Sequence, residues 1–267
     1  MIRRRGTTAA VIALNEETHI EECLDALRWA EECLVVDGGS ADRTVSKAAG
    51  TARVLQRPFD TFARQRNFAL DKVNTEWVLF VDADERVSPA LAAEVQEVVD
   101  RGAQAPQAAG GGADVAASSK LPAGYWVPRK NLMLGRWVRH AGWWPDYQMR
   151  LFRRDFGRYD EGRDPHELVT LGGHAGYLRE PLLHYNYGTV GEMFARQELY
   201  ARREAAGLLA QGIQPVARRV AVRPLREFWR RYITLKGYRE GGLGMLLAVL
   251  MAWYEYRVQV HLMRAYG

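Results

Sequence analysis

Two carboxylates stand two residues apart at the end of an apolar run. The run is Trp77–Val81, and Asp82-Ala83-Asp84 follows it directly. A segment that is apolar on both faces is typical of a central strand in a parallel sheet, and ligands of open α/β sheets bind beyond the carboxyl ends of such strands. Oxygen ligands at this spacing suit Mg²⁺ or Mn²⁺, which in turn binds phosphates. We therefore expect a divalent cation here, with Asp84 as its main ligand.

Two upstream segments repeat this arrangement of an apolar run followed by polar residues. Thr8–Leu14 is followed by Asn15-Glu16-Glu17, and Cys33–Val36 is followed by a polar stretch from Asp37 to Asp42. Three strands are thus expected to bring acids and amides to one edge of a sheet. The fold class predicted is α/β, with a doubly wound, mostly parallel sheet. This order of elements is common to many domains and does not by itself specify a chemistry.

Helix signals lie between and after these strands. The expected capping residues are Thr18 with Glu21, Ser40, Thr61, Ser88 before Pro89, and Thr189 with Glu192. They predict helices on both faces of the sheet, over 62–70, from Pro89 towards Val99, and from about Thr189 to about Ala210. A further strand is expected at Leu182–Tyr185.

Several motifs, in this order along the chain, resemble those of family 2 inverting glycosyltransferases of the GT-A fold. The first four are Ala13–Glu17 (ALNEE), Val35–Thr44 (VVDGGSADRT), Arg66–Leu70 (RNFAL) and Phe80–Glu85 (FVDADE). Two more, Asp146–Arg154 (DYQMRLFRR) and Asp164–Glu167 (DPHE), are similar to the branch that adds a sugar to the lipopolysaccharide inner core. The similarity covers about residues 7 to 200. Many members carry a second acid after the Asp37 position, where this chain has Gly38.

The resemblance implies roles for residues at the nucleotide end of the site. Asp82 is expected to hold the ribose or a metal-bound water, and so counts as a second candidate metal ligand. The other expected nucleotide-sugar contacts are Leu14, Glu16 and Asp37 near uracil or ribose, and Arg64 and Arg66 near the diphosphate. Each arginine by itself is equally consistent with a solvated surface charge.

An inverting transfer also needs a general base for the acceptor hydroxyl. The family supplies it from an acidic pair after an Arg-Arg segment, and Glu167 stands where that base falls, with His166 in place of the first acid. His166 could cap or pack, or it could contact the metal or the diphosphate. Asp146 is the rival candidate base, and its alternative role is a salt bridge to Arg150.

Length and composition limit the organisation of the chain. Its 267 residues, 48% of them hydrophobic, suffice for one substantial core or a core with a small appendage. We expect a catalytic domain over residues 1–212, with a flexible Ala/Gly-rich insertion at 101–123, and a C-terminal region over 213–267. The two cysteines, Cys23 and Cys33, are expected to be reduced thiols of a cytoplasmic protein.

The positive charge is concentrated in the C-terminal region. Residues 218–240 hold eight Lys or Arg and two Glu, a net charge of +6, while the whole chain carries +5. On a helix after Pro224, the apolar residues share one face and the arginines share the other; the apolar set is Leu225, Phe228, Trp229, Tyr232 and Leu235. Such helices suit an anionic membrane surface, although packing on the catalytic domain is the alternative. No nucleic-acid-binding motif accompanies the arginines, so no nucleic-acid partner is expected.

Together these features predict a metal-dependent inverting glycosyltransferase. Its donor is expected to be a nucleotide sugar, most simply a UDP-hexose such as UDP-glucose, and its acceptor a lipid-linked saccharide such as the lipopolysaccharide inner core. It would act at the inner face of the cytoplasmic membrane as a peripheral protein. Two alternatives remain: a nucleotidyltransferase that forms nucleotide sugars, whose usual Gly-rich first loop is replaced here by Asn-Glu-Glu, and a non-catalytic nucleotide-sugar-binding protein at the membrane.

Overall fold

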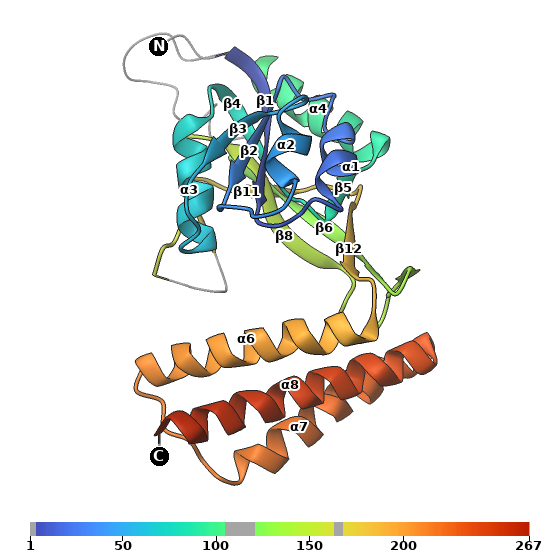
Figure 1. Ribbon diagram of the computed structural model, residues 1–267. Coiled ribbons are helices and arrows are strands. Elements are labelled where there is room, and N and C mark those ends of the chain that lie inside the picture. The colour runs from blue at the N-terminus through green and yellow to red at the C-terminus, as the bar shows by residue number, and fades with distance from the viewer. Residues whose placement is uncertain (1–3, 105–120, 163–167, 267) are drawn as a thin grey trace. The chain divides into compact units, whose positions relative to one another are not determined.

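The computed structural model describes residues 4–104, 121–162 and 168–266, which form two compact units (Figure 1). The first, called here the sheet unit, comprises Met1–Arg129 and Tyr147–His184; the second, the helical unit, comprises Lys130–Asp146 and Tyr185–Gly267. The compact units therefore divide the chain elsewhere than at the expected boundary after residue 212. The expected division by function, into residues 1–212 and 213–267, stays a prediction.

The sheet runs in the order β3-β2-β1-β4-β8-β6-β12-β5, with β7 and β11 paired to β6. Its parallel half consists of β1 (Arg4–Ala13), β2 (Glu32–Asp37), β3 (Arg53–Gln56) and β4 (Thr75–Asp82). The remaining strands are β5 (Glu85–Val87), β6 (Gly124–Met133), β7 (Arg136–Trp137), β8 (Asp146–Arg153), β11 (Ala175–Tyr177) and β12 (Leu182–Tyr187). β8 pairs antiparallel with β4, and β12 pairs antiparallel with β5. A separate pair joins β9 (Gly157–Tyr159) to β10 (Val169–Leu171). The predicted mostly parallel α/β fold is confirmed.

Helices cover both faces of this sheet (Figure 1), and each face has its own apolar core. One core holds Val11 of β1 and Val81 of β4 together with residues of α1 (Ile20–Asp25), α2 (Thr44–Ala48) and α4 (Pro89–Gln104). The other holds Ala10 and Phe80 with residues of α3 (Phe62–Lys72). Because side chains alternate along a strand, the same continuous apolar run supplies both cores.

Three of the expected helix caps are confirmed, and two are wrong. Thr61 Oγ1 accepts from the Arg64 amide at 3.3 Å, Ser88 Oγ from Leu91 at 3.1 Å, and Thr189 Oγ1 from Glu192 at 3.2 Å. α1 instead begins after His19, without a side-chain cap, and α2 after Arg43. The Ser40 hydroxyl is bonded to the Asp37 carboxylate at 2.5 Å, so the loop and not the helix uses it.

Most of the flexible insertion expected at 101–123 lies outside the described residues. α4 continues through residues 101–104, and β6 begins at Gly124. Residues 105–120 lie outside the described part of the chain.

The helical unit is built from α6 (Val190–Ala210), α7 (Arg219–Trp229) and α8 (Gly242–Tyr266), with the π-helical turn Arg230–Thr234 and the 3₁₀ turn Gly237–Glu240 before α8. α8 packs against both α6 and α7. Its core contains Met193 of α6 with Leu247 and Leu250 of α8. No helix in the described residues is both long and apolar enough to cross a bilayer.

The prediction that a helix follows Pro224 is wrong in one respect, because Pro224 lies inside α7, which begins at Arg219. The apolar face expected on this helix meets different surroundings along its length. Leu225 and Trp229 are exposed, and Leu225 also lines, together with Phe228, a groove between α7 and α8.

Candidate active site

The acids that end the parallel strands lie at one edge of the sheet. Asp37, the last residue of β2, pairs in register with Ala13 of β1, and Asp82, the last residue of β4, pairs with Ile12. Parallel strands in this register bring their carboxyl ends together. The convergence that the sequence predicted is therefore present in the sheet unit.

The loops after β1 and β2 are fastened to one another by hydrogen bonds. The Asn15 amide donates to Ser40 Oγ at 2.9 Å, and Asn15 Oδ1 accepts from the Ala41 amide at 2.8 Å. The Glu16 amide donates to Thr44 Oγ1 at 2.8 Å. Asn15 adopts a left-handed backbone with φ of 57°, a conformation that asparagine tolerates better than most residues. Leu14, next to it, is exposed at this edge.

Asp37 is buried and organises the turn that follows β2. Its carboxylate accepts from the Gly39 amide at 3.0 Å and from the Ser40 amide at 3.1 Å. A carboxylate that is hydrogen-bonded to successive amides fixes the shape of the turn. Its expected contact with uracil or ribose stays a prediction.

Asp82 lies between two arginines that come from distant parts of the chain. Arg66 Nη2 of α3 donates to Asp82 Oδ1 at 2.9 Å, and both Nη atoms of Arg150 on β8 donate to the same carboxylate. Burial alone would raise the pKa of Asp82, but the charges of Arg150 and Arg66 outweigh it and hold that pKa well below its usual range. Asp82 is thus ionised, and its carboxylate accepts hydrogen bonds from both of these guanidinium groups.

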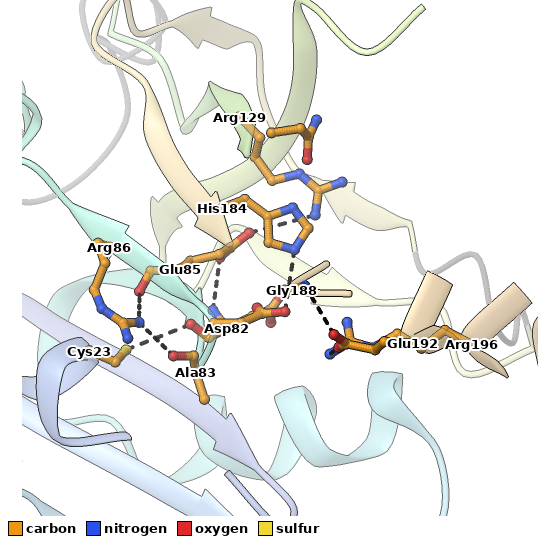
Figure 2. Close-up of polar contacts among 12 residues, drawn as sticks. Cys23, Asp82, Ala83, Glu85, Arg86, Arg129, His184, Gly188, Glu192 and Arg196 are labelled. Atoms are coloured by element: carbon orange, nitrogen blue, oxygen red, sulfur yellow. Dashed lines mark hydrogen bonds and ion pairs between the residues drawn. The ribbon is translucent and has the colours of Figure 1, made fainter. Parts of the chain in front are cut away.

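Glu85 is the buried end of the same cluster. Its Oε2 accepts from the Asp82 amide at 2.8 Å, and its Oε1 lies 3.0 Å from Arg150 Nη2 and 3.6 Å from Arg129 Nη1. Figure 2 shows Arg129 and His184 approaching Asp82 and Glu85 from neighbouring strands. Burial raises the pKa of Glu85, with a further contribution from the Asp82 charge, against the opposing effect of Arg150 and Arg129.

Asp84 has a different neighbour. Its Oδ2 lies 3.4 Å from Nε2 of His184 on β12, and both side chains remain slightly accessible, at 14% and 10%. A carboxylate oxygen and an imidazole nitrogen this close together can bind one divalent cation. Of the two aspartates in the triplet, Asp84 is therefore the one next to a second metal-ligating side chain.

The predicted diphosphate contacts, Arg64 and Arg66, occupy different environments. Arg66 is buried beside Asp82, with its guanidinium carbon 5.6 Å from the Phe80 ring centroid and 5.5 Å from that of Tyr159. Arg64 is 54% exposed and pairs with Glu161 at 3.1 Å. Glu161 also accepts from Asn67 Nδ2 at 2.9 Å. The two arginines therefore do not form one clamp: Arg66 contacts Asp82, and Arg64 contacts Glu161.

The predicted base and its neighbour, Glu167 and His166, lie outside the described residues. The rival base, Asp146, begins β8 within the helical unit, where its Oδ2 accepts from Asn131 Nδ2 at 3.2 Å. Asn131 Nδ2 also donates to the Trp143 carbonyl at 3.2 Å. Both assignments of the base stay predictions.

Sequence reasoning missed Glu85, Arg129 and His184 in this cluster, and it named Arg150 only as a possible partner of Asp146. Glu85 directly follows the Asp-x-Asp triplet and could have been found from that position. His184 had a weaker signal, as an imidazole in an otherwise apolar predicted strand. Arg129 had none, because only the order of the strands brings β6 beside β12.

Comparison with known proteins finds curated relatives and similar solved structures. One of the relatives is a lipopolysaccharide core biosynthesis glycosyltransferase, LpsC of Rhizobium meliloti, 28% identical over 263 residues, which are 96% of this chain and 91% of that protein. Among solved structures, Staphylococcus aureus TarS 1–349 in complex with UDP matches over 97% of this chain and 91% of that one, with 14% identity and a TM-score of 0.45. Mycobacterium tuberculosis glucosyl-3-phosphoglycerate synthase with Mn²⁺, UDP and glucosyl-3-phosphoglycerate matches over 36% of this chain and 39% of that one, with 26% identity and a TM-score of 0.31.

The family profile gives the assignment. The profile described as glycosyl transferase family 2 matches residues 8–185, which hold the parallel strands, the Asp-x-Asp triplet and His184. With its acids gathered at the carboxyl edge of that sheet and this profile matched over more than half of its length, the chain belongs to glycosyl transferase family 2.

Proposed function

We propose that this glycosyltransferase moves a hexose from a nucleotide sugar, a UDP-hexose such as UDP-glucose, to a lipid-linked saccharide, with inversion at the anomeric carbon and with a divalent cation. The observation that carries the proposal is the pair Asp84–His184 beside the Asp82 cluster, at the edge where Asp37 and the loop after β1 converge. The acceptor class rests on the similarity to LpsC, a lipopolysaccharide core biosynthesis glycosyltransferase. Membership of the family favours this reading over a nucleotidyltransferase or a non-catalytic binding protein.

The Asp84 carboxylate fits Mg²⁺ or Mn²⁺, and the imidazole of His184 favours Mn²⁺ of the two. Asp84 and His184 offer one oxygen and one nitrogen, and among the residues that the structure describes no third acid, histidine or cysteine joins them. Few protein ligands are usual for these ions when substrate phosphates and water complete the coordination. A cation bound there would stabilise the negative charge that develops on the departing diphosphate.

The chain's own residues would divide the remaining tasks. Asp82, held by Arg66 and Arg150, would present its accessible edge to the ribose, and the loop shaped by Asp37 would bind the nucleoside. The acceptor hydroxyl would attack the anomeric carbon as the bond to the diphosphate oxygen breaks, so that the nucleoside diphosphate leaves with the bonding electrons. A carboxylate, Glu167 in our proposal, would take the proton of that hydroxyl.

The metal assignment is tested with Asp84→Asn, which keeps the shape of the side chain and removes its charge. Transfer from UDP-[¹⁴C]hexose to membrane lipids should fall by about 100-fold or more, and the Mn²⁺-dependent rise in melting temperature with UDP should shrink. His184→Asn should weaken the same Mn²⁺-dependent binding. Asp25→Asn, at an exposed pair with Arg28, is the matched control. Near wild-type turnover of Asp84→Asn would show that Asp84 is not the ligand.

The base is identified by comparing Glu167→Gln with Asp146→Asn at saturating donor. The true base should lose about 100-fold or more in turnover while UDP-hexose affinity, measured by calorimetry, stays within about threefold. The other variant should lose acceptor affinity or stability instead. Full turnover by Glu167→Gln would transfer the role to Asp146 or to another group.

The peripheral location is part of the same proposal. An enzyme with a lipid-linked acceptor must reach a membrane surface, and the basic residues of 218–240 suit the anionic inner face of the cytoplasmic membrane. Recovery of the full chain with membranes after cell fractionation would support this location, and recovery entirely in the supernatant would oppose it.

A further inference from the structure

An apolar groove lies between α7 and α8 in the helical unit. It encloses about 520 Å³ and is lined by side chains that include Val220, Pro224 and Phe228 of α7 and Val249, Ala252 and Trp253 of α8. This volume is within the roughly 300–1,000 Å³ of ordinary ligand sites. Its lining has no charged side chain, so it suits a hydrocarbon better than a sugar or a nucleotide.

An exposed apolar stripe adjoins this groove on the outer face of α7. Val222, Leu225 and Trp229 are 58%, 70% and 62% exposed, and their spacing of three and four residues places them on one side of the helix. Leu225 also lines the groove, so the stripe and the groove form one continuous surface. Large apolar side chains gathered in this way mark an interaction surface in a stable protein.

Arginines without a close acidic partner flank the stripe. Arg218, Arg219 and Arg226 have no ion pair within 4 Å among the described residues, whereas Arg223 pairs with Glu255 and Arg230 with Glu227. Arg218 and Arg219 also stand at the start of α7, whose first turn contains no acid. The helix dipole is positive at this end, so these cations are unfavourable there unless an anion approaches.

We propose that the groove binds an acyl chain of an anionic phospholipid, with the phosphate held by Arg219 and Arg226 and with Leu225 and Trp229 inserted at the bilayer interface. Both chemistries of a lipid, the hydrocarbon and the anionic headgroup, are matched on adjoining surfaces of one helix pair. The inference rests on the membrane-surface part of the proposed function and is independent of the sugar transfer.

A second copy of the chain is a less suitable occupant. A two-fold contact places the same patch of both copies face to face. It would bring the arginines that flank one stripe close to those that flank the other. Anionic lipid covers the apolar residues and neutralises the arginines together.

The surface is tested by co-flotation of the full chain with vesicles of phosphatidylcholine alone or with about one third phosphatidylglycerol. Wild type should prefer the anionic vesicles, and about 0.5 M NaCl should release much of it. Leu225→Asn should weaken binding by about tenfold, and Arg226→Gln by about fivefold. Leu199→Asn, at an exposed leucine on α6 of the same unit, is the matched control and should bind like wild type.

The groove is tested separately, with vesicles whose phosphatidylglycerol carries bromine on its acyl chains. Bromine quenches tryptophan at short range, so quenching should include Trp253 and decrease in Trp253→Phe. Ala252→Phe, which fills the groove, should reduce this quenching while the arginines and the stripe still bind the vesicle. Thermal unfolding without lipid checks that each variant folds.

The outcomes distinguish the acyl-chain site in the groove from binding of the helical unit to a membrane surface. Quenching that is unchanged in both Trp253→Phe and Ala252→Phe would overturn the acyl-chain site while leaving the membrane surface intact. Absence of binding to any vesicle would overturn both the site and the proposed membrane association, whereas sugar transfer to a soluble acceptor fragment would be unaffected. A doubled mass in light scattering that Leu225→Asn abolishes would assign the surface to a second copy instead.

Discussion

Asp82 and Asp84 are two residues apart, yet their carboxylates have different neighbours. Asp82 is held by Arg66 and Arg150, whereas Asp84 faces His184. The difference arises because Asp82 ends β4 and Asp84 lies in the turn to β5. A motif of two similar acids therefore holds one carboxylate that is paired with two arginines and one that lies next to a histidine.

Arg150 is the residue on which this cluster depends most. It is buried and bonded to both Asp82 and Glu85, so its removal would leave the buried Glu85 and the half-buried Asp82 without their main countercharge. Arg150→Met should lower the free energy of unfolding by about 3–5 kcal/mol. Arg158→Met, at an exposed pair with Asp71, should cost less than about 1 kcal/mol. Chemical denaturation measures both, and equal losses would contradict this account.

At the scale of the element, one carboxylate joins two helices of the helical unit. Glu198 on α6 accepts from Arg257 Nη2 at 2.8 Å and lies 2.9 Å from His261 Nε2, both on α8, while Arg202 of α6 donates at 3.1 Å. Burial alone would raise the pKa of Glu198, but these donors outweigh it and lower that pKa to about 2. The contact between α6 and α8 is thus partly ionic as well as apolar.

This link predicts a dependence of stability on pH. A carboxyl group with a lowered pKa in the folded state stabilises the protein fully above its unfolded pKa, and this stabilisation is lost as pH falls through the folded value. Glu198→Gln should therefore be less stable than wild type at pH 7, by about 1–3 kcal/mol, and the difference should vanish between about pH 4.5 and 2. Thermal unfolding of both proteins across this range is the measurement; a constant difference would exclude the ionic contribution.

At the scale of the whole molecule, the acids at the sheet edge lie in one compact unit, and the basic segment with its exposed apolar stripe lies in the other. Residues 218–240 carry a net charge of +6 and the rest of the chain −1. Asp37, Asp82 and Asp84 belong to the sheet unit, and the exposed stripe belongs to the helical unit. The chemistry and the proposed attachment to a surface can therefore be altered by separate substitutions.

Removal of the C-terminal helices tests membrane attachment less specifically than Leu225→Asn or Arg226→Gln. Leu243, Leu247 and Leu250 of α8 form the core of the helical unit with Met193 of α6 and Tyr187 of β12. Removal of residues 218–267 would expose Met193 and the other α6 residues of this core, so we expect the shortened chain to aggregate without any membrane present. Centrifugation and circular dichroism of the purified fragment would check this, and a soluble, fully helical α6 would contradict it.

The sequence by itself determined the parallel core and the edge where the chemistry lies. Uninterrupted apolar runs exclude solvent on both faces, so they specified β1, β2 and β4 and placed Asp37 and Asp82 at their carboxyl ends. The helix caps Thr61, Ser88 and Thr189 were also predictable, because a capping side chain bonds to an amide only two or three residues away.

Only the tertiary structure decided which charges meet. Arg66 and Arg150 are 16 and 68 residues from Asp82, and His184 reaches Asp84 through the position of β12 in the sheet. Such pairs depend on strand order, which local patterns do not encode. The sequence likewise did not decide which apolar residues of α7 meet α8: Phe228 lines the groove between the two helices, whereas Trp229 is exposed.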